Sequence, residues 1–200
     1  MSFVLTADQI DSRTQGDLVD GALQRLLSVA TVLPFTRTVG DELQGLMDDP
    51  VSVVDAIVIL MRSEDWHLGL GIGPVERPLP DDTRRARGPA FVCARAAVTA
   101  AKSDPSHLCV VAALEEDHEA YDVQAVLRLT AAVRRRRSEP GWEAVDLVSA
   151  GSTRSEAAEK LGISRQAVGQ RLQAAAWSVE EAARPTLVRL LARADRAASE

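Results

Sequence analysis

The chain has 200 residues, of which 46% are hydrophobic and 4% aromatic, enough for one large or two small aliphatic cores. Its formal net charge of −6 argues against indiscriminate nucleic-acid binding, which needs a basic surface. The sequence has no apolar run near the roughly 20 residues of a membrane span, and its first residues do not resemble a signal peptide. We therefore expect a cytoplasmic protein without a membrane partner, in which Cys93 and Cys109 are buried, reduced thiols.

The hydrophobic pattern of the first two thirds of the chain predicts alternating strands and helices. Alternating or continuous apolar runs predict strands at 3–6, 35–39, 42–47, 66–72 and 108–113. Apolar residues at helical spacing predict helices at 15–32, 50–61, 90–102 and 115–136, with a charged loop at 74–87. This order contains a βαββαβ core, which indicates an antiparallel-containing sheet with helices on one face, the ferredoxin-like α+β arrangement.

A run of arginines, Arg134 to Arg137, and the Ser-Glu-Pro that follows it indicate a domain boundary. We expect an α+β domain at 1–137 and an all-helical domain at 138–200. The arginines either contact DNA phosphate or form a solvated helix end. We favour phosphate contact, because a candidate DNA-binding motif follows them.

The last part of the chain, 178–198, continues a helical pattern. Pro185 marks either a break in this helix or a new first turn. Leu187, Leu190 and Leu191 form an apolar stripe, which belongs either to a core or to a dimer seam.

Residues Gly151 to Trp177, GSTRSEAAEKLGISRQAVGQRLQAAAW, have the pattern of a helix-turn-helix. The segment 155–161 predicts a short helix that Gly162 ends, because glycine adopts the left-handed C-cap backbone at little cost. Ser164 then caps a second helix that begins at Arg165. Apolar residues at helical spacing predict a small core of Ala157, Ala158, Leu161, Ile163, Val168 and Leu172.

The second of these helices begins with side chains of the kind that reach base edges and phosphates in a major groove. The segment 134–171 has eight basic and five acidic residues, so positive charge is concentrated around the motif. The spacing E-A-A-x-x-L-G-I-S-x-x-A-V resembles the helix-turn-helix of bacterial regulators and of sigma-factor region 4, although ordinary αα-hairpins that bind no DNA remain the alternative. We predict that the motif binds DNA through Ser164, Arg165, Gln166, Gly169, Gln170 and Arg171, with Arg154 and Lys160 on the DNA backbone.

Two acidic residues near the N-terminus are candidate metal ligands. Asp8 follows the first predicted strand, and Asp41 lies in the turn between the second and third. If the first and third strands are neighbours, both carboxylates project from one edge, where Mg²⁺ or Mn²⁺ would relieve their repulsion. Metal ions held there could activate an attacking oxygen and steady a triphosphate. Aspartate is also common at strand ends and turns, so a purely structural role stays open.

Four segments carry a family resemblance in the right order over residues 3–113: L-T-A-D-Q-I-D-S-R, T-V-G-D-E-L-Q-G, G-L-G-I-G-P-V and R-G-P-A-F-V-C-A-R. They resemble the SatD family. They are also similar, more distantly, to class III nucleotidyl cyclases, whose palm-like sheet has the topology predicted above. The resemblance implies that the metal aspartates would be Asp8 and Asp41, and that a ligand pocket would include Asp8, Arg37, Asp41 and Arg95.

The similarity to cyclases weakens at the catalytic positions. The cyclase asparagine would fall on Val92, which cannot form a hydrogen bond, and the cyclase arginine would fall on Ala96. Arg95 stands one residue early, which on a helix is a rotation of about 100°. We therefore expect the fold and a nucleotide or metal pocket, without cyclase turnover.

The sequence thus predicts a DNA-binding transcriptional regulator that is not an enzyme. Its partners would be double-stranded DNA and a second copy of the chain, since single helix-turn-helix modules usually read palindromes as dimers. The degenerate cyclase-like domain would dimerise and sense Mg²⁺ or a nucleotide effector. The alternatives are a metal-dependent, nucleotidyl cyclase-like enzyme with an accessory helical tail, and a protein-interaction module whose tail docks on a partner.

Overall fold

Strand β1 (Phe3–Gln9) lies at the centre of a sheet in the computed structural model, which describes residues 2–114 and 118–197. Within these residues the sheet has five strands, in the order β2-β3-β1-β4-β5. The strands predicted from the sequence are confirmed, although β2 is shifted two residues towards the N-terminus and β1 continues three residues beyond the expected range, so that Asp8 lies inside it. The remaining bounds are β2 (Leu33–Arg37), β3 (Glu42–Met47), β4 (Trp66–Ile72) and β5 (Leu108–Ala112).

The topology confirms an α+β fold. Strand β1 is antiparallel to both β3 and β4, so these two run parallel to each other with β1 inserted between them. Strands β1 and β2 flank β3 in the same way. These two split β-α-β units make up the expected βαββαβ core. Strand β5 then extends the sheet parallel to β4.

The helices around the sheet differ from the prediction in two places. Of the helix expected at 15–32, only the part that forms α2 is observed, from Val19 to Leu26. A separate short helix, α1, ends at Gln15, and Gly16 follows it with a φ of 79°. The loop at 74–87 contains a 3₁₀ turn, η1, anchored by the buried Thr83, whose hydroxyl donates to the Pro34 carbonyl at 2.7 Å. Residues 115–117 of the predicted fourth helix lie outside the described residues. The observed bounds are α1 (Ser12–Gln15), α2 (Val19–Leu26), α3 (Pro50–Leu60), η1 (Thr83–Arg85), α4 (Pro89–Ala101) and α5 (His118–Arg135).

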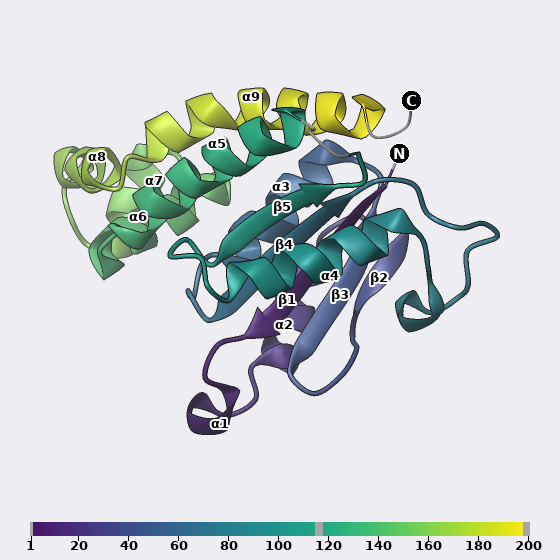
Figure 1. Cartoon of the computed structure of the whole chain (residues 1–200). Coiled ribbons are helices and arrows are strands. Elements are labelled where there is room, and N and C mark those ends of the chain that lie inside the picture. Colours follow the sequence, from purple (N-terminus) through teal and green to yellow (C-terminus); the bar gives the residue numbers. More distant parts are fainter. Residues whose placement is uncertain (1, 115–117, 198–200) are drawn as a thin grey trace. The chain divides into compact units, whose positions relative to one another are not determined.

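Helices cover both faces of the sheet, so the prediction of helices on one face is wrong (Figure 1). Residues Phe3, Leu5 and Ala7 of β1 pack into the larger core with α2, α3 and α5. Val4 points to the opposite face and packs with Ala90 and Ala94 of α4. Helix α4, which connects the parallel strands β4 and β5, therefore lies on the opposite face of the sheet from α3.

Glycines in β4 allow α4 to lie very close to the sheet. A Cβ added to Gly69 would lie 2.2 Å from the backbone nitrogen of Val98, and one added to Gly71 would lie 2.1 Å from the carbonyl oxygen of Ala90. Any side chain at either position would therefore collide with helix backbone, which cannot rotate away. The glycine-rich segment G-L-G-I-G thus serves helix–strand packing.

The remaining helices are α6 (Glu139–Ser149), α7 (Arg154–Leu161), α8 (Arg165–Ala174) and α9 (Trp177–Ala197). The chain forms two compact units, Leu129–Pro185 and Met1–Arg128 together with Thr186–Glu200. Because α5 and α9 each contribute to both units, the division into domains at 1–137 and 138–200 stays a prediction. Pro185 lies inside α9 and does not break it. The buried Leu187 and Leu191 belong to the larger core, so the predicted stripe is core.

Gly69→Ala should destabilise the α+β unit by about 1–3 kcal/mol or more, because the added methyl group meets backbone atoms of α4. Urea unfolding measures this change. Gly21→Ala, in an exposed part of α2 with open space around the added methyl, should instead stabilise by about 0.5–1 kcal/mol. A Gly69→Ala protein as stable as the parent would show that α4 does not depend on this close approach.

Candidate nucleic-acid interface

The turn between α7 and α8 has the construction that the sequence predicts. Gly162 ends α7 in the left-handed conformation with a φ of 64°, and the Ser164 hydroxyl caps α8 by accepting from the Ala167 amide at 3.1 Å. Helix α7 begins one residue earlier than expected, at Arg154, because Thr153 is its N-cap. The Thr153 hydroxyl accepts from the Glu156 amide, and the Glu156 carboxylate accepts from the Thr153 amide, a reciprocal capping box.

The predicted core of the motif is confirmed. Ala157 and Ala158 of α7 are buried, as are Val168 and Leu172 of α8. Leu161 and Ile163 are partly buried against them. Helix α6 adds Trp142, Ala144 and Val145, so three helices share one small core.

The opposite side of α8 forms an open hollow of about 510 Å³ together with the start of α7. Positions 166, 169, 170 and 173 follow one another at helical spacing, which places them on one face away from the buried Val168 and Leu172. The structure thus brings five of the eight predicted DNA-binding residues together and adds Gln173, which the sequence reasoning missed although it lies two turns after Gln166. The lining residues are Arg154, Arg165, Gln166, Gly169, Gln170 and Gln173.

The other three predicted residues lie outside the lining of this hollow. The Ser164 hydroxyl is the cap of α8. The Lys160 ammonium donates to the Ser152 hydroxyl at 3.0 Å, and Arg171 pairs with Glu143 of α6 at 2.8 Å. Arg171 therefore links α8 to α6 here, and DNA contact by these three residues stays a prediction.

The polar side chains of the hollow have unused hydrogen-bonding capacity. Within the part of the chain that the structure describes, no hydrogen bond or ion pair engages the side chains of Arg154, Arg165, Gln166, Gln170 or Gln173. The first turn of α8 contains no acid and begins with Arg165, although a helix N-terminus favours negative charge. Helix α7, by contrast, has Glu156 in that position. The start of α8 therefore suits an external anion.

Two of the four clustered arginines are structural, so the preference for phosphate contact is wrong for them. Arg134 and Arg137 are 9% and 8% exposed, and both guanidinium groups lie over the Trp142 ring. The distances from their Cζ atoms to the centroid of the ring are 4.8 and 4.7 Å. Both pair with the Glu180 carboxylate, and Arg137 also donates to the Ala175 carbonyl at 2.8 Å. This cluster connects the ends of α5 and α8 to α6 and α9 within the second unit.

Glu180→Ala should destabilise the helical unit by about 3–5 kcal/mol, because it leaves two buried guanidinium groups without their carboxylate. Thermal unfolding followed by circular dichroism measures the loss. The matched control is Glu181→Ala, which removes the exposed neighbouring acid and should change stability by less than about 0.5 kcal/mol. Equal stabilities of the two variants would contradict a structural role for the cluster.

The two acidic residues that face each other across β1 and β3 are Asp8 and Glu42. Strands β1 and β3 are neighbours as expected, but the residue opposite Asp8 in the register is Glu42, one position after Asp41. Each carboxylate has a cationic partner from α4 or its C-terminal end: Lys102 lies 2.9 Å from Asp8, and Arg95 lies 3.4 Å from Glu42. Glu42 is only 6% exposed and also accepts from the Thr38 hydroxyl. A metal ion at this pair would have to displace these partners.

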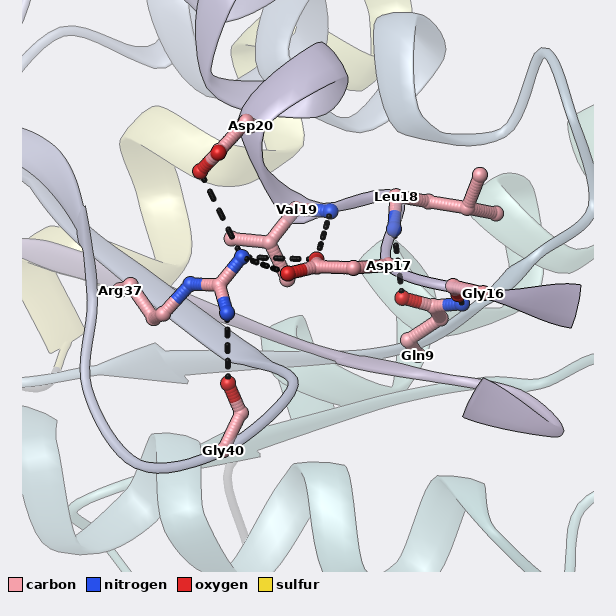
Figure 2. A network of polar contacts seen from close by, with 8 residues as sticks. All are labelled: Gln9, Gly16, Asp17, Leu18, Val19, Asp20, Arg37 and Gly40. Carbon is pink, nitrogen blue, oxygen red and sulfur yellow. Dashed lines mark hydrogen bonds and ion pairs between the residues drawn. The ribbon is translucent and has the colours of Figure 1, made fainter. Parts of the chain in front are cut away.

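Arg37 lies on the other face of the sheet from Asp8, because it is opposite Leu43 whereas Asp8 is opposite Glu42. Leu43 is a residue of the larger core, and the Arg37 guanidinium reaches Asp17 at 2.6 Å and Asp20 at 3.4 Å (Figure 2). It also donates to the Gly40 carbonyl at 3.3 Å. The hydrogen bond from Arg37 holds the pKa of Asp17 below its usual value. Arg37 therefore lies apart from Asp8, whereas Asp41 lies beside β1, where its carbonyl accepts from the Gln9 amide at 3.2 Å. Ligand binding by Asp8, Arg37, Asp41 and Arg95 stays a prediction.

Beside Asp8 the structure places a pair of histidines, His67 and His107, that lie 40 residues apart in the sequence and that the sequence analysis did not single out. His67 is opposite Asp8 in the register, and its Nδ1 lies 3.2 Å from Nδ1 of His107. Burial lowers the pKa of His67, and His107 lowers it further. Among the described residues no group of three or more histidine, cysteine or acidic side chains is arranged to hold a metal ion.

The lowered pKa of His67 predicts a pH dependence of stability. The folded chain binds a proton at His67 less readily than the unfolded chain does, so the free energy of unfolding should fall as the pH drops below about 6.5. Urea unfolding of the parent protein and of His67→Gln at pH 7.5 and pH 5.5 isolates this contribution. The variant should lose less stability on acidification, whereas an identical loss in both proteins would contradict the assignment.

Comparisons with known proteins leave the family open. No family model matches the chain, and no curated protein matches it by sequence. A crystal structure of a regulator of polyketide synthase expression from Bifidobacterium adolescentis is similar at a TM-score of 0.30 and 16% identity, over 100% of this chain and 81% of that one. A similarity this low carries no argument about fold or function, so the resemblances to the SatD family and to cyclases stay predictions. Among the described helices, none is long and apolar enough to cross a membrane.

Proposed function

We propose that this protein is a DNA-binding transcriptional regulator that reads a major groove with the outer face of α8. The observation that carries the proposal is the set of side chains around the open hollow, two arginines and three glutamines without partners among the described residues. A surface this rich in unpaired donors and acceptors, held on a rigid helix, has the chemistry of base-edge recognition.

The charges support the same function. The unit Leu129–Pro185 has nine basic and seven acidic residues, whereas the rest of the chain has 14 basic and 22 acidic residues. DNA would therefore meet a weakly positive helical unit on an otherwise acidic protein. Weak non-specific attraction leaves base contacts to decide the affinity.

Each residue type has a distinct role in this proposal. Arginine binds guanine through O6 and N7, and glutamine binds adenine through N6 and N7. Arg165 at the start of α8 would contact a base, and Arg154 on α7 would contact phosphate. Gly169 would let the DNA approach the α8 backbone, since open space surrounds the position of its absent Cβ.

The α+β unit would bring two copies together, so that two α8 helices read a palindromic site. Sensing of Mg²⁺ or a nucleotide by this unit, and the alternative of a metal-dependent nucleotidyl cyclase-like enzyme, stay predictions. Asp8→Ala separates the two functions, because it should abolish turnover by an enzyme and leave DNA binding by the helical unit intact.

Arg165→Ala should weaken binding to the upstream DNA of the protein's own gene by about 1–3 kcal/mol, because it removes a base contact. Arg154→Ala should instead weaken binding to all sequences similarly. It should also reduce the slope of the logarithm of the binding constant against the logarithm of the salt concentration by about one, the contribution of one phosphate contact. Mobility shifts at several salt concentrations measure both effects. Unchanged binding in Arg165→Ala would remove the recognition role of α8.

A backbone variant completes this experiment. Gly169→Ala meets no atom of the chain and should raise helix stability by about 0.5–1 kcal/mol, yet it should weaken DNA binding because its methyl group projects into the hollow. Gly21→Ala is the matched control, with the same chemical change in α2. Equal DNA affinities of the two alanine variants would mean that DNA does not approach this face closely.

A further inference from the structure

A second open hollow, of about 790 Å³, lies in the α+β unit at the beginning of α4. Its walls come from the segment before α4, from the first two turns of that helix and from the end of β5. Its volume falls within the range of small-molecule sites, roughly 300–1,000 Å³. Asp8, Glu42 and the DNA-binding residues do not line this hollow. Its one link to the acidic pair is Arg95, which lines the hollow and contacts Glu42.

Part of the lining of this hollow is apolar. Phe91, Val92 and Ala113 line it, and Val92 is 70% exposed although it lies on a helix that packs against the sheet. Phe91 is partly buried and packs against the smaller core on this face of the sheet, so its ring has a fixed support. An exposed apolar surface on a supported helix favours an apolar ligand group.

Two arginines also line the hollow, Arg87 and Arg95. Arg87 has no side-chain hydrogen bond or ion pair among the described residues, and Arg95 is 65% exposed with only the 3.4 Å contact to Glu42. The segment 76–95 has five basic and three acidic residues, in a unit that has 14 basic and 22 acidic residues overall. Glu76 is the acidic residue among the described residues that line the hollow. Positive charge is therefore concentrated at this hollow in an otherwise acidic unit.

We propose that the hollow binds an amphipathic organic anion. Arg87 and Arg95 would hold its carboxylate, sulfonate or phosphate group, since guanidinium groups pair with such planar or tetrahedral anions through charge-assisted hydrogen bonds. Phe91, Val92 and Ala113 would contact its aliphatic or aromatic body. Glu76 would oppose the anion and so limit its affinity.

The test uses the fluorescent anion 8-anilinonaphthalene-1-sulfonate on the intact chain, with decanoate, decylamine and decanol as competitors of equal tail length. Decanoate should displace the probe more effectively than decanol, and decylamine should be the weakest. Equal displacement by all three compounds would overturn the proposal, because the hollow would then accept any apolar tail. Absence of saturable probe binding would overturn it as well.

Substitutions of the lining residues test whether Arg87, Arg95 and Glu76 contact the anionic group of the probe. Arg87→Ala and Arg95→Ala should each raise the Kd of the probe about tenfold, whereas Glu76→Gln should lower it by up to about threefold. Arg25→Ala removes an exposed arginine from α2 as the matched control and should leave the Kd unchanged within about a factor of two. Equal Kd values for Arg87→Ala and Arg25→Ala would overturn the assignment. No DNA is present, so the outcome is independent of the proposed DNA binding.

Discussion

Burial of Val168 and Leu172 on one side of α8 decides what the other side of the helix can do. Because side chains recur every 3.6 residues, a helix that buries these positions must expose 166, 169, 170 and 173. The small Ala157 and Ala158 allow α7 to lie close on the buried side, and the Gly162–Ser164 turn sets the angle between the helices. Everything proposed about DNA recognition depends on this division of one helix into a packed face and a free face.

Local chemistry made this part of the molecule predictable. The left-handed glycine, the serine cap and the apolar spacing of the helix-turn-helix are properties of neighbouring residues, and the structure has each of them. The succession of strands along the chain was predictable for the same reason, because each apolar run is a property of neighbouring residues. Helix ends were less accurate: α7 begins at Arg154 because Thr153 and Glu156 cap each other, and Pro185 fits inside α9.

Long-range placement was not predictable, because it depends on register and on which face a residue occupies. The sequence did not indicate that the antiparallel register would put Glu42, the neighbour of Asp41, opposite Asp8. The glycines of β4 gave no sign that α4 would cross the second face, and a cluster of arginines gave no sign that Arg134 and Arg137 would be buried around Trp142. Charged residues near a motif thus have to be separated by their contacts before a function is assigned to them.

Selection of duplexes from a random DNA pool by the purified full-length chain, followed by sequencing, tests the central claim most directly. The account predicts that a short motif is enriched, that it occurs as an inverted repeat, and that enrichment is lost with Gln166→Ala and Gln170→Ala combined, which alter only exposed side chains of α8. Recovery of the input composition by the unaltered chain would contradict sequence-specific DNA binding. A motif that survives the double substitution would place recognition elsewhere on the protein.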